Sequence, residues 1–271
     1  MKGSKTLLLV LILAHCFGSK ALEAGMPCRV SPLARRTVVY SCKSLRDNAP
    51  DNAPVAVAFF DADSTLRVSR SGAPCANHYL DVILLPMVAP RIRALAHEGY
   101  LIAIVSNQGG VSRGYLSLER AEAGLRRTCE LLNRAGAPVH YFDFAEDYDA
   151  FRKPRVAMAR LLNQLLEKRL GRGIDWSRSF MVGDSAWKRG VDQEPDGTPG
   201  RDFSNSDRFF AKNVRENLGS GEGMVFHHPR NFFGWVDYGV FNFHSLSELR
   251  EFLEDRREFA PGVNALGFTS R

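Results

Sequence analysis

Two acidic residues one position apart, Asp61 and Asp63, are the first residues in this sequence whose types and spacing could do chemistry. They come shortly after residues 54–58, a proline followed by small and β-branched apolar residues that predict a buried strand. Alternate residues of an extended segment point the same way, so both carboxylates are expected to face one cavity at the end of that strand. Two anions so close require a cation or a shared proton. An acidic surface turn is the alternative interpretation of the same pattern.

Polar residues of complementary kinds follow other predicted strands. Ser106 comes directly after residues 100–105, and Asp184 follows residues 179–182. Lys153 stands at the start of the helix predicted before the second of these strands. Phosphoryl transfer needs such a set, because it requires a nucleophile, a divalent cation and groups that hold the phosphate oxygens. Taken singly, each residue also has an ordinary interpretation as a cap or as a solvated charge.

The elements that must position these residues alternate between strand and helix through most of the 271-residue chain. This alternation predicts an α/β fold with a doubly wound, Rossmann-like, mainly parallel sheet and helices on both faces. No segment is long enough for a large cap domain, so the site is expected to be open. The strands are expected at residues 54–58, 100–105, 139–144, 179–182 and 224–226, and the helices at 87–97, 118–135, 156–170, from about 202 onward and at 245–252.

The residues at these strand ends resemble the four motifs of the haloacid-dehalogenase-like (HAD) phosphatases, in the family's order. The segment DADST at 61–65 resembles the first motif, and VSNQ at 105–108 resembles the second. Lys153 matches the third motif and GD at 183–184 the fourth. Ser64 stands where the family usually has glycine, which leaves every reactive group of the motif in place.

The resemblance implies a Mg²⁺-dependent phosphomonoester hydrolase that works through an aspartyl-phosphate. Asp61 would be the nucleophile, and Asp63 would protonate the leaving oxygen and then activate water. Lys153, the third catalytic residue, would bridge the phosphate to Asp61. The resemblance further implies the substrate-binding residues Thr65, Ser106, Asn107 and Arg113, the metal ligands Asp61, Asp63 (through its carbonyl) and Asp184, and the supporting residues Ser185, Asp202 and Asp207.

Two subfamilies share the NQGGVSRG pattern at 107–114 and the RKP triplet at 152–154. Histidinol-phosphate and heptose-bisphosphate phosphatases typically carry a Cys/His zinc loop before the lysine, but residues 143–151 contain neither cysteine nor histidine. The segment DFSNSDRFFAKN at 202–213 instead closely resembles the phosphatase domain of polynucleotide kinase 3′-phosphatases. A polynucleotide 3′-phosphatase that processes DNA ends is therefore predicted, with nucleic-acid 3′ ends as its partners.

Two alternatives to this function remain open, and the sequence also bears on kinase activity and on phosphate binding. The sequence contains no GxxxxGK[ST] segment, so no kinase activity is expected. A HAD phosphatase for small phosphomonoesters such as nucleotides or sugar phosphates is one alternative. A non-catalytic binding protein on the same fold is the other. Residues that could line a phosphate path, or be solvated surface charges, are Arg67, Arg113, Arg155, Lys188, Arg189 and Arg208.

The first 21 residues predict a signal peptide rather than part of the fold. Two lysines precede an apolar run at 7–17, and Ser19-Lys20-Ala21 offers a small-x-small cleavage site. Export after cleavage near Ala21 is expected, with no stable membrane span left; an uncleaved N-terminal anchor is the alternative. Removing three lysines and no acidic residue lowers the formal net charge from +6 to +3, which permits nucleic acid as a partner without arguing for it.

The remaining 250 residues divide into an N-terminal extension and linker at 22–54, a phosphatase domain at 55–256 and a tail at 257–271. Four cysteines remain after signal removal, and an even number in an exported protein allows disulfides. A Cys28–Cys42 bond is the first pairing to consider, and free buried thiols are the alternative. Cys129 falls on the apolar face of a predicted helix and is expected in the core.

Overall fold

The computed structural model describes residues 28–29, 38–39, 53–186, 204–219, 221–240 and 242–254. No helix in these ranges is both long enough and apolar enough to cross a membrane. The signal peptide and the export that it implies stay predictions, as does a Cys28–Cys42 disulfide. Predicted features outside the described residues are the signal peptide at 1–21, the tail at 257–271, Cys42, Lys188, Arg189 and Asp202.

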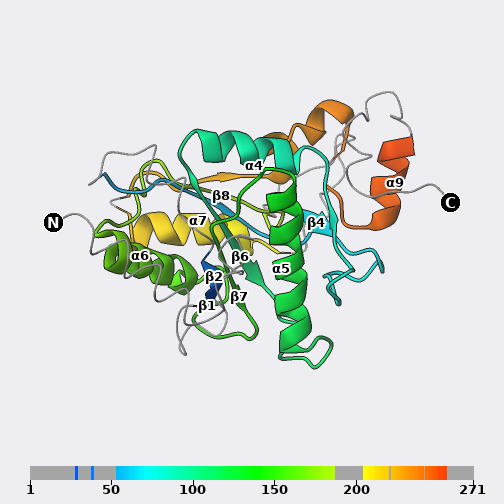
Figure 1. The fold of residues 1–271 in the computed structure, drawn as a ribbon, viewed down its shortest axis with the longest axis horizontal. Helices are drawn as coiled ribbons and strands as arrows, with labels where there is room; N and C mark the ends of the chain where they lie inside the picture. The colour runs from blue at the N-terminus through cyan, green and yellow to red at the C-terminus, as the bar shows by residue number, and fades with distance from the viewer. Residues whose placement is uncertain are drawn as a thin grey trace, which may run out of the picture.

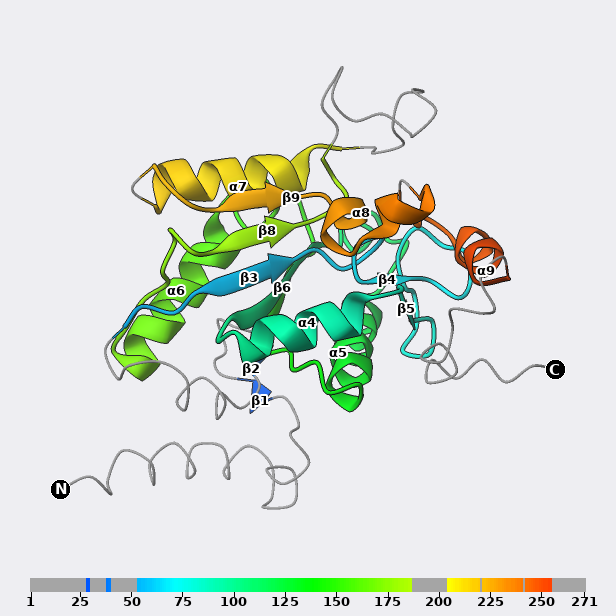
Figure 2. The same ribbon diagram turned by 90° about the horizontal axis from the view of Figure 1, so that it is seen from above.

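Five parallel strands form the centre of the sheet, as the sequence predicted. Their order is β7–β6–β3–β8–β9; β7 and β6 are labelled in Figure 1, and β6, β3, β8 and β9 lie side by side in Figure 2. Two short antiparallel strands of the N-terminal extension continue this sheet beyond β7, so the extension is not only a linker. The strands are β1 (Cys28–Arg29), β2 (Val38–Val39), β3 (Val57–Phe60), β6 (Leu101–Asn107), β7 (Tyr141–Ala145), β8 (Phe180–Val182) and β9 (Val225–His227).

Helices cover both faces of the sheet (Figure 2). Helices α4 (Val88–His97) and α5 (Leu118–Arg134) pack on one face, and α6 (Ala157–Leu170) and α7 (Ser206–Asn217) pack on the other. The doubly wound α/β fold is therefore confirmed. The chain continues after β9 through α8 (Pro229–Phe232), the 3₁₀ helix η2 (Trp235–Tyr238) and α9 (Leu246–Glu254).

Successive residues of the central strands enter two separate cores. Phe60 and Ile104 pack against α4 and α5, whereas their neighbours Phe59 and Val105 pack against α6 and α7. This division follows from the two-residue period of a strand, which sends alternate side chains to opposite faces. Because all four of these strand residues are fully buried, the carboxyl ends of β3 and β6 are held rigidly. Cys129 lies in the α5 core, as predicted.

A small antiparallel pair, β4 (Arg67–Val68) with β5 (Ile83–Leu84), follows the first motif. The pair lies in the connection between the first motif and α4. The segment between β7 and α6 holds no helix or strand. Within the described residues, therefore, no large cap domain stands over the carboxyl edge of the sheet.

Candidate active site

The strand register brings the ends of β3, β6 and β8 to one edge of the sheet. Phe60 pairs with both Ile104 and Val182. The Asp61 N–H then donates to the Val182 carbonyl over 2.9 Å, which continues the ladder by one residue into the first motif. As a result Asp61 is anchored between the neighbouring strands, next to the residues that follow them.

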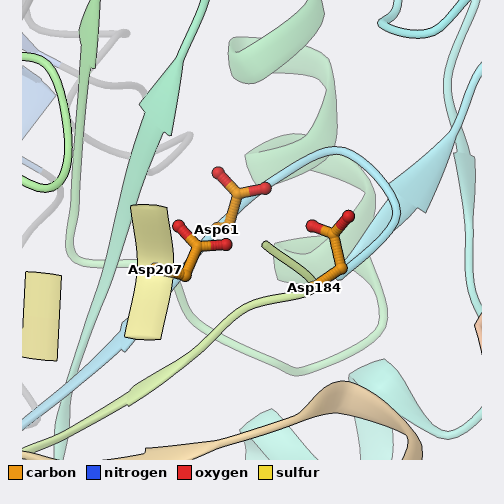
Figure 3. Close-up of side chains that lie close together, drawn as sticks. All are labelled: Asp61, Asp184 and Asp207. Carbon is orange, nitrogen blue, oxygen red and sulfur yellow. The ribbon is translucent and has the colours of Figure 1, made fainter. Parts of the chain in front are cut away.

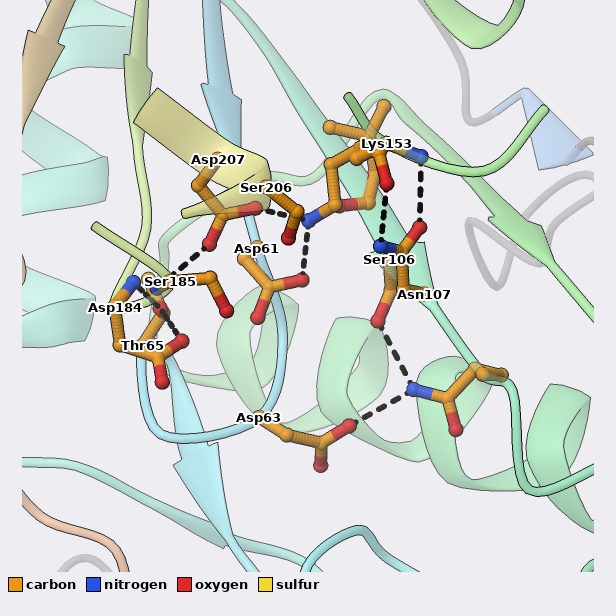
Figure 4. A network of polar contacts seen from close by, with 12 residues as sticks. Asp61, Asp63, Thr65, Ser106, Asn107, Lys153, Asp184, Ser185, Ser206 and Asp207 are labelled. Carbon is orange, nitrogen blue, oxygen red and sulfur yellow. Dashed lines mark hydrogen bonds and ion pairs between the residues drawn. The ribbon is translucent and has the colours of Figure 1, made fainter. Parts of the chain in front are cut away.

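Lys153 lies at the centre of the site although it comes from the connection between β7 and α6. Its Nζ is 2.5 Å from Asp61 Oδ1 and 2.7 Å from Asp207 Oδ1, and it donates to the Val105 carbonyl over 2.7 Å. The residue is only 2% exposed. A buried ammonium group needs anionic or hydrogen-bonding partners in place of water. Lys153 has two carboxylates and one carbonyl, and Figure 4 shows its ion pairs with Asp61 and Asp207.

Three carboxylates gather at the site (Figure 3), and two of them, Asp61 and Asp207, are the partners of Lys153. Asp61, Asp184 and Asp207 are all buried, and each offers an oxygen atom within 4.8 Å of the others. The sequence had placed Asp207 only among the supporting residues, and Asp63 among the metal ligands through its carbonyl. Asp207 lies in the first turn of α7, 23 positions after Asp184, so their places in the sequence offered little reason to put the two together. Its place in the SNSDR segment was the signal that could have found it.

The neighbours of Asp184 and Asp207 fix both side chains. The Thr65 hydroxyl donates to Asp184 Oδ1 over 3.2 Å, and the Asp184 N–H donates back to that hydroxyl over 3.1 Å. The Ser185 N–H donates to Asp207 Oδ2 over 3.0 Å. A Cβ atom on Gly183 would lie 2.3 Å from that same oxygen, so only glycine fits here. Thr65, predicted to bind substrate, is instead fully buried against Asp184.

Electrostatics of the buried groups depend on one another. Burial raises the pKa of the Asp61 carboxyl to about 7, although the nearby Lys153 ammonium lowers it. For Lys153, burial alone would lower the pKa, but the ion pairs with Asp207 and Asp61 outweigh burial and raise it. The buried cluster holds three carboxylates, and one ammonium group pairs with two of them. The excess negative charge would be neutralised by a divalent cation.

Asp63 is bound by a different set of donors. Its Oδ1 accepts from Arg67 Nε over 2.9 Å, and its Oδ2 accepts from Arg67 Nη2 over 3.2 Å and from Gln108 Nε2 over 2.8 Å. The same Gln108 nitrogen donates to the Ser106 hydroxyl over 2.9 Å, which links the second motif to the first. Arg67 had been expected on a phosphate path or in solvent; that expectation was wrong, because its side chain is fully buried.

Backbone geometry in the first motif also departs from the average. Ser64, where glycine is usual, adopts a φ of 57° and lies in the left-handed region. Its N–H donates to the Arg67 carbonyl over 2.8 Å, and the Arg67 N–H donates to the Ala62 carbonyl over 3.1 Å. A residue with a Cβ atom pays a modest strain there, and these two bonds hold the turn.

The segment that carries Lys153 is fixed by Asn107. The Asn107 side chain accepts from the Lys153 N–H over 2.9 Å and donates to its carbonyl over 3.0 Å. Arg113, predicted to bind substrate, is exposed, and it donates to the hydroxyl of Tyr148. The structure thus brings Ser106, Asn107 and Lys153 together at the site and leaves Arg113 at its rim.

The rim carries further basic residues beside Tyr148. The guanidinium of Arg152 lies over the Tyr148 ring at 4.2 Å from its centroid, and that of Arg113 lies at 5.7 Å. Arg155 is exposed and donates to the carbonyls of Tyr148 and Asp149. Arg208 has different neighbours: it is half-buried, donates to the Ala186 carbonyl over 2.7 Å and lies over the Phe226 ring.

A family model described as polynucleotide kinase 3 phosphatase matches residues 56–233, which include every residue of this site. The chain belongs to that family. Family membership and the buried carboxylates together show a HAD-like phosphomonoesterase, as the sequence predicted, with a metal-binding cluster and a phosphorylated substrate.

Relatives of this polynucleotide kinase 3 phosphatase family member include enzymes with two kinds of name. The bifunctional polynucleotide phosphatase/kinase of Schizosaccharomyces pombe is 31% identical over 175 residues, which cover 64% of this chain and 36% of that protein. The chain thus matches about a third of that relative. The D-glycero-beta-D-manno-heptose-1,7-bisphosphate 7-phosphatase of Rhodopseudomonas palustris is 30% identical over 144 residues, or 48% of this chain and 73% of that protein.

Among the solved structures that the chain matches is D,D-heptose 1,7-bisphosphate phosphatase from B. bronchiseptica, complexed with magnesium and phosphate. It is 17% identical, with a TM-score of 0.46, and the match covers 69% of this chain and all of that one.

The donor set of this site fits a hard divalent cation. Asp61, Asp184 and Asp207 offer oxygen atoms only, and oxygen is the ligand that Mg²⁺ prefers. Asp61 and Asp207 are both paired with Lys153 as well, whereas Asp184 accepts from the Thr65 hydroxyl.

Proposed function

We propose that this chain removes phosphate from the 3′ ends of polynucleotides, with Mg²⁺ and through an aspartyl-phosphate on Asp61. The observation that carries the chemistry is the convergence of three buried carboxylates and the Lys153 ammonium at one sheet edge, within the family match. The nucleophile must approach phosphorus in a place where negative charge is balanced, and this edge supplies that balance.

In the proposed reaction an Asp61 carboxylate oxygen attacks phosphorus, and the bond from phosphorus to the ester oxygen breaks. The electron pair goes to that oxygen, which takes a proton from Asp63. Asp63 then removes a proton from a water molecule whose oxygen attacks the phosphoryl group, and Asp61 and inorganic phosphate are released. Ser106, the N–H of Asn107 and Lys153 hold phosphate oxygens during both steps.

Magnesium, when bound by Asp61, Asp184 and the Asp63 carbonyl, supplies positive charge that lowers the repulsion between the carboxylates and the phosphate. Asp207 orients this set through its bonds to Lys153 and the Ser185 N–H.

The rim supports a polynucleotide rather than a small ester. Arg113 and Arg152 lie over the half-exposed ring of Tyr148, and Arg155 donates to the Tyr148 carbonyl, next to the segment that carries Lys153. A polynucleotide brings further phosphates and base faces beyond the terminal phosphate, and arginine and tyrosine side chains bind both. Among the described residues no domain closes over the site, so a chain end has room to enter.

Phosphate release from a short DNA oligomer with a 3′-phosphate, measured with Mg²⁺, tests the proposal. The same oligomer with a 5′-phosphate and a panel of free nucleotides serve as competing substrates. We expect release from the 3′ end alone, and Asp61→Asn should lower it by about 10⁴-fold or more because the nucleophile is lost. Equal rates on the 3′ and 5′ ends would contradict the proposed specificity.

A small bisphosphorylated sugar is the second candidate substrate. The Rhodopseudomonas palustris heptose bisphosphate phosphatase is matched over 73% of its length, which favours this reading. Against it stands the segment between β7 and Lys153, residues 146–152, which contains no cysteine or histidine to build a zinc loop. Turnover of heptose 1,7-bisphosphate but not of 3′-phosphorylated DNA would establish it.

A further inference from the structure

We propose that Arg67 is the positioning residue for the Asp63 carboxylate, so that helix α5 sets the direction of Asp63. This rests on the proposed function in one respect, namely that Asp63 transfers the protons of the reaction. Figure 4 shows Asp63 and Lys153 on opposite sides of Asp61, so the two sides of the site are supported separately.

The guanidinium of Arg67 holds Asp63 with two nearly parallel bonds. Nε reaches Oδ1 over 2.9 Å and Nη2 reaches Oδ2 over 3.2 Å, which is the bidentate arrangement that arginine forms with carboxylates. A bidentate pair fixes the plane of the carboxylate as well as its position. A single donor such as lysine leaves that plane free to rotate.

The far side of Arg67 is anchored on α5. Its Nη1 donates to the Thr128 hydroxyl over 2.9 Å, and that hydroxyl donates in turn to the Gly124 carbonyl over 3.0 Å. Gly124 stands inside the helix, where glycine costs about 1 kcal/mol relative to alanine. A Cβ atom there would lie 3.3 Å from Arg67 Nη1, tighter than most real contacts. The helix therefore tolerates a poor helix former beside the guanidinium.

The remaining donors complete the set around Asp63. The Ala76 N–H lies 3.4 Å from Oδ1, and Gln108 Nε2 donates to Oδ2 over 2.8 Å. Both oxygens thus have two donors, and the side chain is 17% exposed. The Asp63 carboxylate cannot turn toward a leaving oxygen without exchanging a donor. The Arg67 fork, anchored from behind, is the fixed part of this set.

The test separates positioning from structural support by the leaving group of the ester. Phenyl phosphate and p-nitrophenyl phosphate carry the same phosphoryl group, but phenolate is the more basic leaving group and depends more on proton donation. Since kcat/KM reports the steps up to formation of the aspartyl-phosphate, Arg67→Met should lower kcat/KM for phenyl phosphate about tenfold more than for p-nitrophenyl phosphate. The fall should lie in kcat, with KM little changed.

Three comparisons keep the result interpretable. Arg67→Lys should recover part of the loss, because it restores one donor but not the fork. In an Asp63→Asn background, Arg67→Met should change kcat/KM by less than about twofold, because the group that it positions is already inactive. Arg126→Met, which removes an α5 arginine paired with Glu122, is the matched control and should leave the ratio of the two esters unchanged.

An equal loss on both esters, or losses that multiply in the Asp63→Asn background, would overturn the proposal and make Arg67 a structural residue only. If Arg67→Met does not fold, Thr128→Val removes the anchor of the guanidinium and should give the same bias toward loss on phenyl phosphate, at a few-fold size. Both esters report phosphatase chemistry without a polynucleotide. If the protein does not release phosphate from 3′-phosphorylated DNA, the proposed substrate is therefore wrong, but the test of Arg67 with the two esters can still be interpreted.

Discussion

Two ion pairs flank the site, and they differ in how far apart their two residues are in the sequence. Asp61 pairs with Lys153 across 92 positions, through the meeting of strand ends, whereas Asp63 pairs with Arg67 four positions away, within a single turn. The first pair lies between β3, β6 and α7, and the second lies against α5. The comparison indicates that the sheet positions the nucleophile, and that one helix behind the first motif positions the proton-transfer group.

The largest effect is expected from removing the ammonium group of Lys153, which pairs with Asp61. Lys153→Met should lower kcat by about 10²- to 10³-fold, because the charge that balances Asp61 and the phosphate is lost. Steady-state phosphate release measures this. Lys212→Met is the matched control, since Lys212 forms a surface pair with Glu216 at 3.8 Å and should not affect the rate. Equal activity of the Lys153 variant would mean that the pair with Asp61 is not catalytic.

A smaller effect on the same side is expected from Gly183→Ala. The new methyl group would meet Asp207 Oδ2 at 2.3 Å, so the carboxylate must move away from Lys153 and Asp184. We expect a loss of about 10- to 100-fold in activity, which high Mg²⁺ partly restores. The measurement is phosphate release as a function of Mg²⁺ concentration. A variant with an unchanged Mg²⁺ dependence would show that Asp207 does not support the metal ligands.

A smaller effect is expected from Gly124→Ala, which perturbs the ion pair of Asp63 with Arg67. The methyl group would lie 3.3 Å from Arg67 Nη1, so a shift of a few tenths of an ångström is enough to accommodate it. The helix gains about 0.5–1 kcal/mol from the better helix former, while kcat/KM for phenyl phosphate falls by about two- to fivefold. Thermal unfolding and kinetics with both phenyl esters measure this. Lower stability with unchanged kinetics would contradict the link from α5 to Asp63.

No change in activity is expected at His140, which is 2% exposed and lies beside Ile102 near the start of β6, whereas the site lies at the carboxyl end of that strand. Burial lowers the pKa of His140 from 6.5 to about 4. The folded chain therefore binds this proton less readily than the unfolded chain, and stability is lost as the pH falls from 6.5 toward 4. The loss amounts to about 3 kcal/mol.

Denaturant unfolding at several pH values checks this prediction. His140→Asn keeps an acceptor for the Ile102 N–H and removes the titrating ring, so it should lose less stability over the same interval. An identical pH dependence in both proteins would show that His140 does not titrate as its burial implies.

The same comparison explains what sequence reasoning could reach. The alternation of elements predicted the parallel sheet, and the rule that parallel strands share a carboxyl edge predicted that Asp61, Ser106 and Asp184 would meet there. Asp207 was underrated because it follows Asp184 by 23 positions and belongs to α7 rather than to a strand end. Arg67 was misjudged for a different reason: nothing in the sequence shows that Gly124 and Thr128, on a helix far along the chain, form a buried cradle for its guanidinium.

Trapping the covalent intermediate tests the central claim most directly. The Asp63→Asn variant, mixed with p-nitrophenyl phosphate and Mg²⁺ and quenched in acid, should accumulate the mass of one phosphoryl group on the peptide that contains Asp61. The p-nitrophenolate leaving group needs little proton donation, so attack by Asp61 proceeds, whereas hydrolysis of the adduct lacks its base. The wild-type protein should show less of this adduct at the same time, and Asp61→Asn should show none. Turnover of this ester without any adduct on Asp61 in either protein would contradict the account.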